Sequence, residues 1–575
     1  MTALAGKKAV LVTAALPYAN GRLHVGHAAG AYLPADIYAR FLRLTGRECV
    51  FICGSDENGA PITFSALKEG VCPQDVVDRY HVAIRDALAG LGVSFSRYGR
   101  THTPAHDQTA RDWFSRLNEL GHIVSRETDQ VYCAACRAFL PDRYIEGVCP
   151  HPDCRKPGAR GDQCERCGRP VDAVKLADPE CMVCKMRGRP ARGRIEVRST
   201  RHWYFKLDRF EKPLRDYLDA HPEWRDTVKS FSLGMLEGGL KERCITRDLD
   251  WGVPAPLPDA AGKVLYVWFD APIGYVTFTK EHFAEAGTPE RWKDFWRNPE
   301  NGLVHFIGKD NTVFHTVIFP AMMLGHGGYR LADAVVVNEF LNLEGEKIST
   351  SRNHAVWVDE FLKDFPADSL RYYLCAIAPE TSDSDFSWKQ FQARNNGELA
   401  DNLGNFIQRN LAFAARYFDG KVPAVDAPSP AGAAMLAEID AARAEIRALC
   451  DAFRFKAALE RLMLLSRRGN QYFAEEAPWQ LRKTDMAACA KALYAGLRTV
   501  EALGVLMAPF LPFAAEKLRA ALNLPPLAPG DFDAPWRLAG GRGLGTPDVL
   551  FPKYDDAKID PHLERLRPKK EAETP

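Results

Sequence analysis

Apolar runs alternate with stretches of helical periodicity in the first part of the chain. Residues 9–16 form an apolar run typical of a buried parallel strand, and residues 28–44 carry apolar side chains at helical spacing. Residues 48–54 predict a second strand, and residues 74–91 and 103–120 predict two further helices. A strand–helix–strand unit of this kind is right-handed and places its functional loops at the carboxyl ends of the strands.

The alternation returns in the middle of the chain and then gives way to helices. Residues 202–207, 264–269, 303–307 and 334–337 predict strands, several of which run into polar or glycine-containing loops. Between residues 390 and 522, Ala, Leu and Arg recur at the spacing of a helical bundle. We therefore expect an α/β fold with a doubly wound, Rossmann-like parallel sheet in two halves, followed by an all-α helical bundle.

A cluster of cysteines separates the two halves of the predicted sheet. Eight of the 15 cysteines fall there as four close pairs in a setting rich in Gly, Pro and Arg. Two thiolate pairs close a tetrahedral zinc site, so the cluster predicts a zinc-ribbon insertion with one or two structural zinc ions. Nesting of the pairs predicts a first zinc at Cys149, Cys154, Cys164 and Cys167 and a second zinc at Cys133, Cys136, Cys181 and Cys184. Four residues separate Cys149 from Cys154, and His151 between them is an alternative ligand.

Composition adds limits on location and partners. The chain has 575 residues, of which 46% are hydrophobic and 26% charged, as in ordinary globular proteins of several domains. It shows neither an N-terminal apolar leader nor an apolar run of membrane-spanning length, so we expect a cytoplasmic protein without a membrane partner. The net charge is +1, but residues 185–201 hold seven Lys and Arg against one Glu. That stretch is either a phosphate-contacting surface or a solvated linker.

Two histidines, His24 and His27, stand at the turn between the first predicted strand and its helix, in the tetrapeptide HVGH. Backbone N–H groups and the helix dipole make such a turn an anion site, where imidazoles donate hydrogen bonds to phosphate oxygens. The glycine patterns of P-loops and of dinucleotide-binding folds are both missing. Asp56 follows the second strand at the same edge, where it either meets a cation near the phosphates or caps the next helix. Taken alone, the histidines are equally compatible with ordinary surface residues.

These residues, together with more specific segments, resemble the class I aminoacyl-tRNA synthetases, and among them the methionyl-tRNA synthetase family. HVGH resembles the HIGH motif of the class, and KISTS at residues 347–351 resembles the KMSKS loop. The resemblance extends over residues 8–550, and the paired cysteines are similar to a connective peptide of the two-knuckle form. The segments that resemble this one family are ALPYANG at residues 15–21, YVWFDAPIGY at 266–275, HFIGKD at 305–310 and APW at 477–479.

The resemblance implies both a domain organisation and a reaction. L-Methionine and ATP, with magnesium, would give methionyl-adenylate and pyrophosphate, and the methionyl group would pass to the 3′ end of tRNA(Met), initiator tRNA included. The carboxylate attacks the α-phosphate in line, so positioning and charge stabilisation dominate catalysis. The implied parts are a Rossmann-like catalytic domain at residues 1–120 and 202–345, a zinc-binding connective insertion at 121–201, a KMSKS-type loop and stem-contact region at 346–389, an α-helical anticodon-binding domain at 390–530 and a C-terminal tail at 531–575.

The family's functional residues map onto this sequence in three groups. His24, His27 and Lys347 are the expected catalytic residues. The same three residues and Thr350 are expected to bind ATP. Thr350 stands where the family usually has a second Lys, which leaves more of the charge stabilisation to Lys347. The expected methionine-binding residues are Leu16, Tyr18, Asp56, Trp268, Ala271, Pro272, Tyr275 and His315. The expected anticodon-binding residues are Asn405, Arg409 and Trp479; without the resemblance, Trp479 would be assigned to the core.

Two other functions stay open at this point. A catalytically weak or silent tRNA-binding relative would also use zinc knuckles, a basic stretch and a helical bundle, although intact His24, His27, Asp56 and Lys347 speak against it. A synthetase for another apolar amino acid is the nearer alternative. No long editing insertion is visible, because the residues between the sheet halves are mostly zinc ribbon. The chain ends without an appended oligonucleotide-binding domain, so we expect a monomer.

Overall fold

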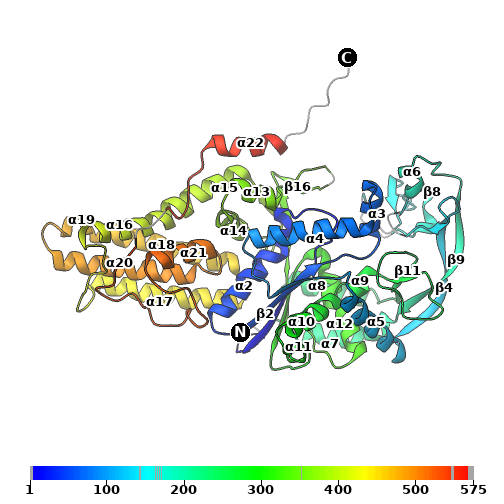
Figure 1. The fold of residues 1–575 in the computed structure, drawn as a ribbon, viewed down its shortest axis with the longest axis horizontal. Coiled ribbons are helices and arrows are strands. Elements are labelled where there is room, and N and C mark those ends of the chain that lie inside the picture. The colour runs from blue at the N-terminus through cyan, green and yellow to red at the C-terminus, as the bar shows by residue number, and fades with distance from the viewer. Residues whose placement is uncertain are drawn as a thin grey trace, which may run out of the picture.

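The protein is elongated, with an α/β part in the middle, a cysteine-rich insertion at one end and a helical bundle at the other (Figure 1). The computed structural model describes residues 4, 6–141, 144–161, 164, 166–167, 169, 171–350, 352–545 and 549–566. Ser351 of the KISTS segment and the last residues of the expected C-terminal tail lie outside this set. No helix within the described residues combines the length and apolar character needed to cross a membrane.

A five-stranded parallel sheet forms the centre of the α/β part, which confirms the predicted doubly wound fold. Its strand order is β14-β13-β1-β2-β3, so the direction of winding reverses between β1 and β13. Ligands of such sheets bind at the carboxyl edge beside this reversal. The five strands are β1 (Ala9–Ala14), β2 (Glu48–Ser55), β3 (Arg97–Arg100), β13 (Gly302–Gly308) and β14 (Ala334–Asn338).

Helices pack tightly on this sheet, and one of them requires glycine in the strands beneath it. The helices include α2 (Leu33–Leu44), α4 (Pro73–Gly90), α5 (Pro104–Glu119), α10 (Ile273–Glu285) and α12 (Phe319–His326). The ring of Phe278 on α10 lies where a Cβ atom would stand on Gly54 of β2 or Gly99 of β3, at 2.4 and 2.3 Å. A side chain at either position would push α10 off the sheet.

Two predicted strands differ in the structure. The strand predicted at residues 264–269 is wrong: β12 covers only Val264–Leu265, and the chain then turns into the short helix α9 (Val267–Asp270). The helical turn buries both Phe269 and Asp270, which strand alternation would have sent to opposite faces. Residues 202–207 do include a strand end, but it belongs to β9 and not to the parallel sheet.

The cysteine-rich insertion is carried on a long antiparallel ribbon. In that ribbon β4 (Ile123–Cys133) pairs with β9 (Ile195–Phe205) along its whole length. Beyond it lie a small three-stranded sheet and the helix α6 (Met182–Met186). The insertion has a hydrophobic cluster of its own, built mainly from cysteines and a few aliphatic side chains. The strands of the small sheet are β6 (Ile145–Val148), β7 (Pro157–Arg160) and β8 (Ala177–Cys181).

The C-terminal half is a helical bundle, as predicted. Its long helices pack around buried Leu, Ala and Ile side chains, and α17, α18 and α20 contact one another. The last helix, α22 (Asp556–Leu566), returns to α15 (Trp388–Arg394), where Lys389 bonds Asp556 at 2.8 Å and Asp560 at 2.9 Å. The bundle helices are α16 (Asn405–Tyr417), α17 (Pro430–Asp451), α18 (Phe455–Glu476), α19 (Pro478–Leu481), α20 (Met486–Leu506) and α21 (Pro512–Ala521).

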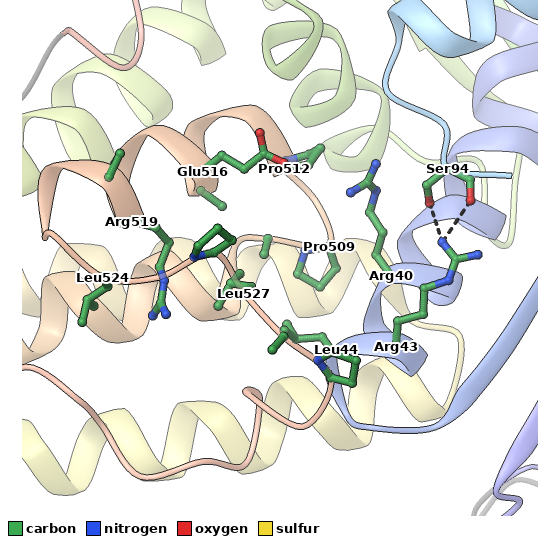
Figure 2. Close-up of a pocket in the computed structure, with 16 residues that line it drawn as sticks. Arg40, Arg43, Leu44, Ser94, Pro509, Pro512, Glu516, Arg519, Leu524 and Leu527 are labelled. Carbon is green, nitrogen blue, oxygen red and sulfur yellow. Dashed lines mark hydrogen bonds between the residues drawn. The ribbon is translucent and has the colours of Figure 1, made fainter. Parts of the chain in front are cut away.

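The helix α2 joins the sheet to the bundle through a buried ion pair. Arg371, in α14 (Ala367–Ala376), lies 2.7 Å from Asp36 of α2 and donates to the carbonyl oxygens of Pro509 and Phe510 at 2.9 Å each. Beside this contact, α2 and α21 border a cavity of about 720 Å³ (Figure 2). The guanidinium of Arg43 in its wall is already bound to Ser94.

Candidate active site

His24 and His27 form a stacked pair at the carboxyl end of β1. His24 is the N-cap of the short helix α1 (Val25–His27) and His27 is its last residue; α1 continues through the π-helix η1 (Ala28–Tyr32) into α2. The ring centroids are 3.6 Å apart, and each Nδ1 accepts from the backbone N–H of the other residue, at 3.3 and 3.4 Å. Because Nδ1 accepts in both rings, the proton of each neutral imidazole sits on Nε2.

These two imidazoles are neutral donors in the protein without ligands. Burial lowers the pKa of His24 to about 2, with His27 as the second cause. Burial of the His27 ring lowers its pKa to about 4, although the residue as a whole is partly exposed. With Nδ1 occupied, the Nε2–H groups remain for a ligand, as phosphate binding requires.

The KISTS segment lies directly against the HVGH turn. A Cβ atom on Gly26 would stand 3.0 Å from the His24 ring and 3.1 Å from Ile348 Cδ1, so a larger residue would crowd both motifs. The backbones are also joined: the Val25 N–H donates to the Val356 carbonyl at 2.9 Å. The two motifs therefore lie side by side, although the chain between them is long.

Lys347 and Thr350 are both exposed, and the segment that carries them lies beside the HVGH turn. Lys347 ends β16 (Glu346–Lys347), which pairs with β15 (Leu341–Leu343), and its Nζ lies 5.2 Å from the Phe340 ring centroid. Thr350 lies in the turn that Ser349 and His354 close with two backbone hydrogen bonds of 2.9 Å. The amine of Lys347 is thus available to a ligand bound beside the HVGH turn.

Asp56 is a buried carboxylate at the end of β2, with 4% of its surface exposed. Its backbone is bridged to the 17–19 segment: the Asp56 N–H donates to Pro17 at 2.8 Å and its carbonyl accepts from Ala19 at 2.9 Å. Burial, and then the charge of Asp270, raise the pKa of Asp56. Its Oδ1 has no hydrogen-bond partner among the described residues, so the site is suited to a cationic group.

Several of the expected methionine residues contact one another close to Asp56. His315 donates from Nδ1 to the Asn311 carbonyl at 3.0 Å, so its Nε2 accepts from the Tyr275 hydroxyl at 2.9 Å. Burial lowers the pKa of His315 to about 4, which keeps the ring neutral. Trp268, 41% exposed, donates from Nε1 to the Tyr18 hydroxyl at 2.7 Å.

The remaining expected residues lie on α10 or next to its N-terminal end. Leu16 approaches α10, its Cδ2 atom lying 3.3 Å from where a Cβ on Gly274 would stand. Ala271 and Pro272 link α9 to α10, which carries Tyr275. The structure thus brings together the apolar residues, Tyr275 and the neutral imidazole that were expected around a thioether.

The structure also reveals polar residues of the site that the sequence did not single out. Asp270 and Asn58 lie behind Asp56, and Asn58 Nδ2 donates to Asp270 Oδ2 at 2.6 Å. His305 lies beside Tyr275 and its Nδ1 is 2.6 Å from the Thr13 hydroxyl. The available signal was a charged residue, Asp270, directly after an apolar run.

The eight clustered cysteines form two tetrathiolate groups. Within each group the four Sγ atoms lie within 4.8 Å of one another, and neighbouring Sγ atoms are 3.4 to 3.9 Å apart. A zinc ion with Zn–S bonds of about 2.3 Å requires tetrahedral edges of about 3.8 Å, so the donor sets fit zinc. The groups are Cys133, Cys136, Cys181 and Cys184, and Cys149, Cys154, Cys164 and Cys167; His151 is a member of neither.

The three expected anticodon residues lie together at the far end of the bundle. Asn405 and Arg409 are one turn apart on α16, and the Arg409 guanidinium lies 5.7 Å from the Trp479 ring centroid and 4.8 Å from that of Phe473. Trp479 is 37% exposed. In Figure 1, α19, which carries Trp479, lies at the end of the bundle away from α2, the helix that follows the HVGH turn.

Sequence comparisons agree with this arrangement. A family model described as "tRNA synthetases class I (M)" matches residues 10–411, and one described as "Anticodon binding domain of methionyl tRNA ligase" matches residues 422–571. A protein named Methionine--tRNA ligase from Bacteroides fragilis is 46% identical over 568 residues, 98% of this chain and 82% of its own length. One of the same name from Pyrococcus abyssi is 46% identical over 562 residues, 96% of this chain and 76% of its own.

Solved structures lead to the same family. Mycobacterium tuberculosis methionyl-tRNA synthetase in complex with methionyl-adenylate matches with a TM-score of 0.79 and 27% identity, over 95% of this chain and 100% of that one. Its apo form matches with a TM-score of 0.71 and 26% identity, over 96% and 99%. The chain therefore belongs to the methionine–tRNA ligases of the class I aminoacyl-tRNA synthetases.

Proposed function

We propose that this chain, as a methionine–tRNA ligase, forms methionyl-adenylate from L-methionine and ATP at the sheet edge between β1 and β13. It then transfers the methionyl group to the 3′ end of tRNA(Met), initiator tRNA included. One observation carries the proposal. The stacked pair of His24 and His27 lies against the Lys347 hairpin, and Asp56, after the neighbouring strand β2, has a buried Oδ1 atom without a hydrogen-bond partner among the described residues.

In the activation step, a carboxylate oxygen of methionine attacks the α-phosphorus while the bond to the leaving pyrophosphate breaks. The Nε2–H groups of His24 and His27 donate to phosphate oxygens, and being neutral they need no proton exchange to do so. Lys347 stabilises the charge that grows on the leaving pyrophosphate. Magnesium accompanies ATP and neutralises part of the triphosphate charge.

Methionine is oriented by one charged and one apolar contact. Asp56 binds the α-ammonium, which repays the cost of burying its carboxylate. The thioether packs on the side chains of Leu16, Trp268 and Tyr275, next to the neutral ring of His315. A neutral imidazole with both nitrogens engaged favours a weakly polar sulfur over a charged side chain.

Two further parts serve the tRNA step. We propose one structural zinc ion in each tetrathiolate group, where it would hold the insertion folded and supply no chemistry. At the far end of the bundle, Trp479 would stack on an anticodon base while Asn405 and Arg409 bind its neighbours.

The test is pyrophosphate exchange into ATP, run with each of the twenty amino acids. Methionine should support the fastest exchange, and Asp56→Asn should raise the methionine KM at least tenfold, because the buried partner of the ammonium loses its charge. Asp216→Asn changes an exposed carboxylate on α7 (Glu211–Asp219) and serves as the matched control. Faster exchange with another amino acid, or none with any, would contradict the proposed function.

A further inference from the structure

A second carboxylate, Asp270, lies behind Asp56 and has no assigned role. It ends α9, is fully buried, and its Oδ1 has no hydrogen-bond partner within the part of the chain that the structure describes. Its Oδ2 accepts from Asn58 Nδ2 at 2.6 Å, and His106 Nε2 of α5 lies 3.6 Å away. A buried carboxylate with so few partners is costly, so its position calls for a functional reason.

Asn58 links this carboxylate to the turn that carries Asp56. Its Nδ2 also donates to the Thr101 carbonyl at 3.2 Å, so its Oδ1 accepts from His102 Nδ1 at 2.9 Å. The backbone N–H of Asn58 in turn stabilises the ionised carboxylate of Asp56. The side chain of Asn58 is thus held on both sides, and its backbone N–H contacts the Asp56 carboxylate.

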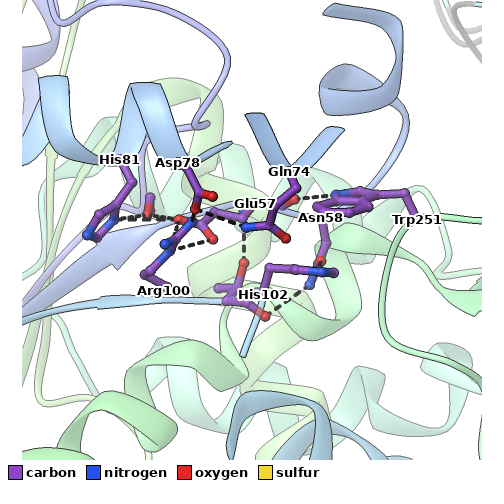
Figure 3. A network of polar contacts seen from close by, with 10 residues as sticks. Glu57, Asn58, Gln74, Asp78, His81, Arg100, His102 and Trp251 are labelled. Carbon is purple, nitrogen blue, oxygen red and sulfur yellow. Dashed lines mark hydrogen bonds and ion pairs between the residues drawn. The ribbon is translucent and has the colours of Figure 1, made fainter. Parts of the chain in front are cut away.

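The other side of the turn is held by an aromatic stack (Figure 3). The His102 ring lies on Trp251, with centroids 3.9 Å apart and planes 16° apart, and Trp251 Nε1 donates to the Glu57 carbonyl at 2.7 Å. Arg100 binds both carboxylate oxygens of Glu57, at 2.8 and 2.9 Å. The residues around Asp56 therefore have little freedom to move.

The ionisable groups around Asp270 are mostly acidic. The groups that face it are His106 and Asp107 from α5, Asp56 from the turn after β2, and Tyr18 from the turn after β1. No Lys or Arg in the described residues forms an ion pair with it. Burial raises the pKa of Asp270, and its charge raises that of Asp56. An α-ammonium bound at Asp56 would neutralise this excess of negative charge.

We propose that Asp270 is a positioning residue for the α-ammonium group of the substrate. Asp270 fixes Asn58, which orients Asp56. Its charge also adds negative electrostatic potential at this place. That potential strengthens the binding of an ammonium group and does not strengthen the binding of a neutral or acylated amine. The inference rests on the proposed role of Asp56 as the ammonium-binding group. If Asp270 acts in this way, tight binding requires a positive charge on the amine, whatever contacts the thioether makes.

The test is Asp270→Asn in the full-length protein. The amide keeps an oxygen for Asn58 Nδ2, is nearly the same size as the carboxylate and removes its charge. The methionine KM in pyrophosphate exchange should rise about 10- to 100-fold, the scale of one charge interaction across several ångströms of protein. The KM for ATP should stay unchanged. The inhibition constant of 4-(methylthio)butanoate, which lacks the amine, should also stay unchanged.

A pH profile adds a readout that a purely structural role would not move. Methionine binding strengthens as pH rises through the pKa of Asp56, because the ionised form binds the ammonium. Removing the neighbouring charge lowers that pKa, so the profile of Asp270→Asn should shift to lower pH. If this variant folds poorly, His102→Ala should produce the same selective loss of methionine binding on a smaller scale, and His102→Gln should restore it.

The outcomes separate this inference from the proposed function. An unchanged methionine KM in Asp270→Asn, or equal losses for methionine, ATP and the amine-free analogue, would overturn it. If Asp56→Asn leaves the methionine KM unchanged, the proposed role of Asp56 is wrong and this inference falls with it. If Asp56→Asn weakens methionine and Asp270→Asn does not, only the inference about Asp270 fails.

Discussion

Replacing Trp479 by Ala should separate tRNA charging from amino-acid activation. The indole is 37% exposed and lies beside the Arg409 guanidinium, so one of its faces is available to an unstacked base. Stacking on such a face is worth about 1–3 kcal/mol per base. At about 1.4 kcal/mol for each factor of ten, kcat/KM for tRNA charging should fall roughly 5- to 150-fold. Methionine-dependent pyrophosphate exchange should stay within about twofold of the parent, because the HVGH turn lies in another domain.

The same substitution also costs stability, and the assay must separate the two effects. The covered part of the ring buries about 150 Å² against neighbours such as Phe473, which at about 25 cal/mol/Å² amounts to at most about 4 kcal/mol of unfolding free energy. Trp479→Phe keeps a stacking face and should lose much less charging activity. Leu464→Ala removes an equally exposed apolar side chain from α18 and serves as the stability control.

The reasoning fails if both activities fall together. Equal losses in charging and exchange for Trp479→Ala, matched by Leu464→Ala, would make Trp479 a structural residue of the bundle. A charging defect in Trp479→Phe as large as that of Trp479→Ala would also count against stacking. Both activities and the urea midpoint should therefore be measured on the same preparations.

Three further changes test other parts of the molecule. Lys347→Ala should slow adenylate formation about 10²- to 10³-fold in rapid-quench measurements, which is the scale of one lost transition-state donor. Thr350→Lys should be tolerated. Unchanged adenylate formation in Lys347→Ala would show that the hairpin takes no part in catalysis. Metal analysis of purified protein should give two zinc equivalents, and Cys184→Ser should lose one and expose the insertion to proteolysis; no zinc in the parent would contradict the tetrathiolate sites. Arg371→Met should lower the free energy of unfolding by about 3–5 kcal/mol in urea titrations, since it leaves Asp36 short of a buried partner, and a loss under 1 kcal/mol would show that Arg40 compensates.

The sequence by itself determined the strands that are apolar throughout. Strands β1, β2, β13 and β14 are covered on both faces, so nearly every position must be apolar, and this signal is local. The sequence also carried the spacing of the cysteine pairs, because each pair holds its thiolates a fixed few residues apart. The HVGH turn could be located for the same reason, since strand, turn and helix follow one another directly in the chain.

Only the tertiary structure decided β3 and α9. Residues 97–100 are polar apart from Tyr98 and form a strand because β2 offers a pairing edge and Gly99 admits the Phe278 ring. Residues 264–269 have strand-like composition, yet the chain turns into a helix that buries Asp270 against Asn58. In both places a partner distant in sequence outweighs the local preference.

The site itself needed the whole fold. Asn58 and Asp270 are 212 residues apart in the chain, and Arg22, beside the HVGH turn, bonds Glu360 across 338 residues. Local pattern predicts where a strand ends and which polar residue follows it, because those properties depend on adjacent residues. Which of these ends meet, which carboxylate stays without a partner and which imidazole nitrogen keeps its proton depend on packing between distant segments. Those features decide the chemistry, and packing is set only when the chain has folded.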